Sequence, residues 1–115
     1  MQVFISNKKL KRSIEDDEER KRRFGPEMAK KIQLRMGALT AAESLAVFWP
    51  PNSGPERCHE LKGDLAGTFS MDLKQPYRLL FLPVDLPKGV EAGEGKHRWQ
   101  AINAVEIVGI EDTHG

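Results

Sequence analysis

Residues 65–82 read LAGTFSMDLKQPYRLLFL, a stretch that predicts two β-strands joined by a tight turn. Apolar and polar residues alternate over positions 65–73, and positions 77–82 are a nearly continuous apolar run. The intervening Lys74, Gln75 and Pro76 are typical of a short hairpin turn. A third run with strand-like alternation covers positions 99–110. Three consecutive strands of this kind predict an antiparallel meander.

The part of the chain before this hairpin predicts helices. Positions 2–6 suit a short opening strand, and 13 of the 16 residues at positions 8–23 are charged, with acid-before-base pairs at the i,i+4 spacing of a helix. This helix is either a solvated face or a contact for a polyanion or a partner protein. Gly25 and Pro26 end it and begin a second helix. The buried face of that second helix is predicted to consist of Met28, Ile32, Met36 and Leu39.

The order of these elements predicts the fold class. A capping box from Thr40 to Glu43 indicates a short third helical turn, and strands follow only after position 55. Helices first and strands second are typical of an α+β fold, in which an N-terminal helical hairpin packs on one face of a small antiparallel sheet. With 115 residues the chain is long enough for one domain, residues 1–115, and positions 83–98 predict a long loop. The uncovered face of the sheet is where we expect a site.

Composition excludes several classes of protein. Hydrophobic residues make up 39% and charged residues 30% of the chain, as in a soluble globular domain and unlike a membrane span or a disordered chain. The net charge of +1, with +4 over residues 1–50 and −3 over residues 51–115, is too small for a stand-alone binder of duplex nucleic acid. Cys58 has no second cysteine to pair with, and positions 1–12 lack the apolar run of a secretory signal. We therefore expect a cytoplasmic protein.

Side chains suited to cutting RNA gather on or beside the predicted strands. They are Arg57, His59, Lys62, Arg78, Asp112, Thr113 and His114. Cleavage without a metal needs a base for the 2′-hydroxyl, cations for the charge of the phosphorane and an acid for the leaving oxygen. His59 and Lys62 are three positions apart and would face opposite sides of a regular strand, so sharing one site requires a bend, which Gly63 makes easy. No cofactor and no metal ligand set is predicted.

Two motifs in this region resemble a known family. Positions 59–70, HELKGDLAGTFS, and positions 76–81, PYRLLF, are similar to the core motif of the HigB-like branch of the RelE/ParE toxin superfamily, the plasmid maintenance killer proteins. The last strand and the Asp112-Thr113-His114 that follows it resemble that family's terminal strand and Asp-Tyr-His. The resemblance implies a RelE-like, microbial-ribonuclease-like fold. It also implies a toxin of a type II toxin–antitoxin system that enters the ribosomal A site and cuts mRNA during translation.

The resemblance further implies functional residues. The family's catalytic positions correspond here to His59, Lys62, Asp112 and His114, with Arg78 matching the arginine of the strand motif. We expect His59 or His114 to act as base or acid. Lys62 and Arg78 would stabilise the transition state, and Asp112 would orient a histidine. The residues expected to contact RNA are Arg57, Lys74, Tyr77 and Thr113.

Partners and alternatives follow from the same resemblance. We expect a cognate helix-turn-helix antitoxin similar to HigA, with the 70S ribosome and mRNA as targets and no membrane partner. Thr113 stands where the family has tyrosine and cannot stack on a base, so either Tyr77 or Trp99 substitutes or base selection is weaker. Two other functions stay open: a ParE-like inhibitor of gyrase that cuts no RNA, and a corepressor that has lost activity and only binds the antitoxin.

Overall fold

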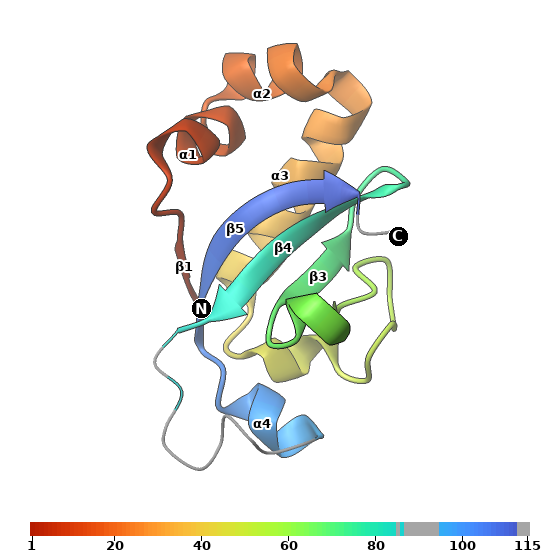
Figure 1. Ribbon diagram of the computed structural model, residues 1–115. Coiled ribbons are helices and arrows are strands. Elements are labelled where there is room, and N and C mark those ends of the chain that lie inside the picture. The colour runs from red at the N-terminus through yellow and green to blue at the C-terminus, as the bar shows by residue number, and fades with distance from the viewer. Residues whose placement is uncertain (85, 87–94, 113–115) are drawn as a thin grey trace.

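The fold places a small twisted sheet against one long helix, with shorter helices beyond both ends of the sheet (Figure 1). The computed structural model describes residues 1–84, 86 and 95–112. In chain order its elements are β1 (Gln2–Phe4), α1 (Lys8–Glu15), α2 (Asp17–Phe24), α3 (Pro26–Ala41), η1 (Leu45–Phe48), β2 (His59–Glu60), η2 (Gly63–Leu65), β3 (Phe69–Asp72), β4 (Tyr77–Pro83), α4 (Lys96–Gln100) and β5 (Ala104–Asp112), where η marks a 3₁₀-helix.

The described strands form one mixed sheet in the order β1-β5-β4-β3-β2. Strands β2, β3, β4 and β5 pair antiparallel with one another, so the α+β class and the predicted meander are confirmed. The expectation of a purely antiparallel sheet is wrong, because β1 runs parallel to β5, with Val3 opposite Val105. One edge of β5 is occupied by β4, and β1 supplies backbone partners for the start of its other edge.

The charged helix predicted at positions 8–23 is broken at Asp16 into α1 and α2. The carboxylate of Asp16 accepts a hydrogen bond from the Glu19 N–H at 2.9 Å, so this residue caps α2 with an extended backbone. The buried Arg20 side chain turns back and donates to the carbonyl of Ile14 at 2.7 Å. Because the end of α1 leaves carbonyl groups without helical partners, this contact stabilises the break.

The core lies between α3 and the face of the sheet that it covers. Ile32 and Leu39 of α3 are fully buried there, as the predicted spacing of that helix requires. Phe69 and Phe81 are cross-strand partners whose rings stack at 5.9 Å between centroids. Side chains alternate along a strand, so the residues between these core positions face the other side of the sheet.

Three predicted boundaries are wrong. Trp99 lies in α4 rather than in the last strand, which begins at Ala104. The first strand of the meander begins at Phe69, because Gly63–Leu65 forms η2 and Leu65 is exposed. The capping box is absent: Thr40 lies inside α3 and donates to the carbonyl of Met36, and Ser44 caps η1 instead. The predicted loop at 83–98 falls largely on residues outside the described ranges, and its end forms α4.

None of the helices in the described ranges combines the length and apolar character needed to cross a bilayer.

Candidate functional site

The face of the sheet turned away from α3 carries His59 and Arg78, two of the polar residues that the sequence points to. The strand register places His59 opposite Ser70 and Ser70 opposite Leu80. Two positions further along β3, Asp72 stands opposite Arg78. Because residues two apart on a strand share a face, His59 and Arg78 lie on the same side of the sheet, about 12 Å apart when two strand spacings and a two-residue offset are combined.

Asp72 holds two arginines beside each other on this face. Its carboxylate oxygens lie 3.3 Å from Nε of Arg57 and 3.6 Å from Nε of Arg78, and Gln75 donates an amide hydrogen bond at 3.0 Å. Asp72 is buried, whereas 57% of the Arg57 side chain and 18% of the Arg78 side chain are exposed. The arrangement fixes two guanidinium groups where an anion can approach Arg57 from solvent.

Arg35 supports Asp72 from the helix side, and sequence reasoning missed both residues. The buried guanidinium of Arg35 on α3 donates to the carbonyl of Asp72 at 2.7 Å and to that of Pro55 at 3.1 Å. A signal for Arg35 exists, because it stands three positions after Ile32 and four before Leu39 on the buried stripe of the helix. Nothing in the local pattern around Asp72 sets it apart from the exposed acids of the chain.

His59 and Lys62 line one pocket of about 370 Å³, called here the His59–Lys62 pocket. Its walls are Trp49, Pro51, Asn52, His59, Glu60, Lys62, Gly95, Arg98 and Trp99. Nδ1 of His59 lies 3.0 Å from the carbonyl oxygen of Arg57. A carbonyl only accepts hydrogen bonds, so Nδ1 carries a proton and Nε2 of the neutral ring keeps its lone pair. His59 can therefore take a proton through Nε2.

The chain bends between His59 and Lys62, as predicted. β2 ends at Glu60, and Gly63 adopts a left-handed backbone with φ of 67°. The loop then closes on itself, since Leu61 donates to the carbonyl of Thr68 at 2.8 Å. This bend brings both side chains to the same pocket, which a continuous strand would not do.

Glu60 ties this loop to α4. One of its carboxylate oxygens accepts a hydrogen bond from the Gly67 N–H at 3.1 Å, and the other forms an ion pair with the buried Arg98. The guanidinium of Arg98 also lies over the ring of Phe69, 5.5 Å from its centroid. Sequence reasoning missed this pair, which is 38 positions apart in the chain. The pair neutralises charge at one wall of the pocket and leaves Lys62 as an exposed cation.

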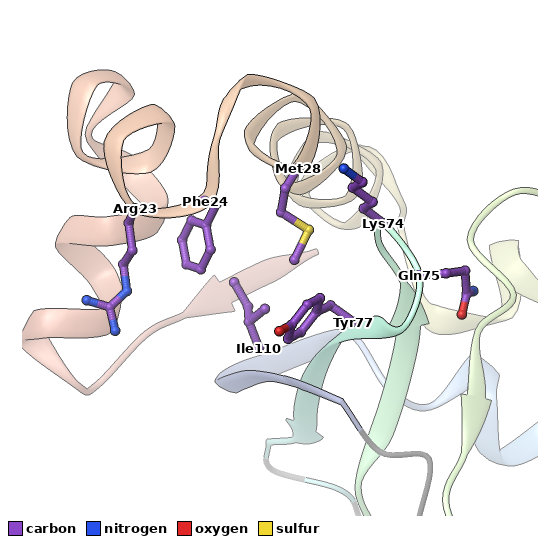
Figure 2. Close-up of a pocket in the computed structure, with 7 residues that line it drawn as sticks. All are labelled: Arg23, Phe24, Met28, Lys74, Gln75, Tyr77 and Ile110. Atoms are coloured by element: carbon purple, nitrogen blue, oxygen red, sulfur yellow. The ribbon is translucent and has the colours of Figure 1, made fainter.

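Tyr77 and Lys74 lie away from the His59–Lys62 pocket. They line a separate pocket of about 550 Å³ on the helix side, with Arg23, Phe24, Met28, Gln75 and Ile110 (Figure 2). Lys74 forms an ion pair with Glu27 at 3.1 Å. Trp99 does line the His59–Lys62 pocket, but only 4% of it is exposed. Neither aromatic residue that we expected to replace the family's tyrosine offers an open ring beside His59.

The end of β5 lies next to the Arg78 end of β4. Asp112, the last residue of β5, stands opposite Tyr77, and Glu111 stands opposite Arg78. Thr113 and His114 lie outside the described residues, so the roles predicted for them stay predictions. The structure brings together His59 and Lys62, and it places Arg57 and Arg78 on the same sheet face.

Cys58 is unsuited to nucleophilic chemistry although it precedes His59. The thiol is fully buried. Burial, with a smaller contribution from the charge of Glu56, raises the pKa of Cys58 far above its ordinary value. Because only the thiolate is a nucleophile, this cysteine is a packing residue of the core.

Comparisons with known proteins identify the fold. No family model matches the chain, and no curated protein matches its sequence. A YoeB/ParE toxin from Agrobacterium tumefaciens superposes with a TM-score of 0.55 at 18% identity, covering 99% of this chain and 100% of that one. The YoeB–YefM complex from Staphylococcus aureus gives a TM-score of 0.53 at 17% identity, covering 96% and 94%. A YoeB dimer from the same organism gives 0.50 at 18% identity, covering 94% and 91%. The chain therefore has the fold of the YoeB/ParE toxins over nearly its whole length.

Proposed function

We propose that this chain is the toxin of a type II toxin–antitoxin system and acts as a ribosome-dependent mRNA endonuclease of the HigB-like branch. The observation that carries the proposal is that His59 and Lys62 line one pocket, while Arg57 and Arg78 lie on the sheet face that His59 shares. These residue types supply a base and cations for metal-independent cleavage of RNA. The fold shared with YoeB/ParE toxins agrees with this assignment.

The proposed reaction is an internal transfer of the RNA phosphate. Nε2 of His59 removes the proton from the 2′-hydroxyl, whose oxygen attacks the adjacent phosphorus as the bond to the 5′-oxygen breaks. Lys62 and Arg78 stabilise the negative charge on the phosphorane oxygens. His114 donates a proton to the departing 5′-oxygen, and Asp112 orients a histidine. The products are a 2′,3′-cyclic phosphate and a 5′-hydroxyl.

The proposed partners of this toxin are the ribosome and an antitoxin. The 70S ribosome presents the mRNA in its A site, and a cognate helix-turn-helix antitoxin similar to HigA binds the toxin until it is needed. A YoeB–YefM complex among the similar structures supports the idea of a bound partner. The small net charge also fits a nuclease that relies on the ribosome to deliver its substrate. A protein of net charge +1 attracts free RNA only weakly.

Primer extension on a defined mRNA in a bacterial translation extract tests this function. We expect new 5′ ends when the protein and ribosomes are both present, and at least about tenfold fewer with His59→Ala or Lys62→Ala because base and cation are lost. His97→Ala and Lys30→Ala are matched controls, since both side chains are exposed and lie outside the pocket. Both controls should cut like the wild type.

Two other results would contradict the proposal. An intact message with growth arrest and DNA damage in cells would favour the gyrase inhibitor. An intact message with normal growth and a stable antitoxin complex would favour the corepressor.

A further inference from the structure

We infer that the His59–Lys62 pocket is a nucleobase subsite in which the base beside the scissile phosphate stacks on Trp49. The inference rests on the proposed function for the identity of the ligand, RNA, and goes beyond it by naming the residue that holds the base. Trp49 is the half-buried aromatic residue of this pocket, which it lines together with His59 and Lys62.

Packing fixes the indole of Trp49 in place. Its ring meets that of Trp99 edge to face, with centroids 5.1 Å apart and an angle of 89° between planes. Trp99 in turn packs on the core residue Phe69 at 5.5 Å. The backbone N–H of Trp49 also donates to the carbonyl of Ala46 at 3.1 Å, which anchors the main chain of this residue at the end of η1. A ring held in this way binds a planar group with little loss of side-chain freedom.

The charge of the pocket suits a nucleotide. Glu60 and Arg98 pair with each other, so their charges cancel. Within the described ranges Lys62 has no recorded ion pair, and its exposed ammonium stands at the rim. A lone cation beside an aromatic ring fits a ligand with one anionic group and one flat ring, as a nucleotide has. The volume of about 370 Å³ lies within the range of pockets that hold small organic groups.

Asn52 gives the subsite a group that can read a base. It is exposed and lines the pocket together with Trp49, and its backbone N–H donates to the carbonyl of Cys58 at 3.0 Å. This bond holds Asn52 against the start of β2, next to His59. A side-chain amide both donates and accepts hydrogen bonds, which matches the edge of a nucleobase. Trp49 would thus supply affinity and Asn52 a preference among bases.

Binding of a short single-stranded 2′-O-methyl oligoadenylate measures the subsite apart from cleavage. This probe lacks the 2′-hydroxyl and cannot be cut by the proposed reaction, and a matched probe with an abasic residue keeps the same phosphates. We expect Trp49→Leu to weaken binding of the intact probe about tenfold, and Trp49→Phe to weaken it less than threefold, because stacking needs a ring. Binding of the intact probe should also quench tryptophan emission saturably.

The controls separate stacking from folding. Val47→Ala alters an exposed apolar residue of η1, two positions before Trp49 and outside the pocket, and it should bind like the wild type. Equal affinity of the wild type for the intact and abasic probes, or an unchanged affinity of Trp49→Leu, would overturn the inference. Binding that depends on Trp49 in a protein that produces no new mRNA 5′ ends would support the subsite and refute the nuclease.

Discussion

Asp72 has two sets of partners at one position of the sheet. Its carboxylate lies between the guanidinium groups of Arg57 and Arg78 on the open face, while its backbone carbonyl accepts a hydrogen bond from Arg35. The sequence did not reveal these contacts because Arg35 and Asp72 are 37 positions apart. That His59 and Lys62 share a site was predictable, since three positions separate them and Gly63 follows directly. Local spacing thus predicts neighbours within a loop but not the residues that support them.

Replacing Arg35 tests whether this buried arginine supports the sheet. We expect Arg35→Met to lower the free energy of unfolding by about 3 kcal/mol, because the carbonyl oxygens of Asp72 and Pro55 lose their donor while apolar volume is kept. Lys30→Met, an exposed position on α3, should change it by less than about 0.5 kcal/mol. Urea unfolding measures both. Similar values for the two variants would show that the hydrogen bonds of Arg35 contribute little.

The charged segment at the N-terminus shows how a helix can be predicted correctly and its continuity missed. Acid-before-base spacing favours helix throughout positions 8–23, and both α1 and α2 are helical. Asp16 separates the two helices because its carboxylate serves as the N-terminal cap of α2. Within a run of charged residues a capping aspartate looks like any other acid, so only the folded chain reveals it. The prediction that the last strand begins at Trp99 is wrong for a related reason. Trp99 is buried as part of the helix α4, and a buried apolar residue looks the same in either element.

Removing the carboxylate of Asp16 should destabilise the junction between α1 and α2. Asp16→Ala is expected to lower the free energy of unfolding by about 1 kcal/mol, because the Glu19 N–H loses its acceptor. Glu18→Ala is the matched control: this neighbouring exposed acid has no recorded side-chain bond among the described residues. Hydrogen exchange of the α2 amides should rise in Asp16→Ala and stay unchanged in Glu18→Ala. Equal hydrogen exchange of the α2 amides in both variants would mean that the Asp16 cap does not stabilise the start of α2.

At the scale of the whole molecule, the order of elements was enough to predict an α+β domain. The meander β3-β4-β5 and the covering helix α3 follow from local patterns alone. The position of β1 does not, because a strand of three residues pairs with β5 across almost the entire chain. A second long-range contact, the ion pair between Glu60 and Arg98, holds α4 next to the end of β2. The site is thus assembled from a local motif and from distant segments that the fold brings to it.

On ribosome-bound mRNA, the His59–Lys62 pocket is proposed to promote attack of a 2′-oxygen on the adjacent phosphorus. Single-turnover cleavage on programmed 70S ribosomes tests it with two messages, one all-ribose and one with a single 2′-deoxy residue at the mapped cut site. The wild type is expected to cut the all-ribose message and to leave the deoxy message intact. Lys62→Ala should be at least about tenfold slower, with Lys30→Ala unchanged. Cleavage of the deoxy message as fast as the all-ribose message, or an unchanged rate for Lys62→Ala, would show that this pocket does not promote attack by the 2′-oxygen.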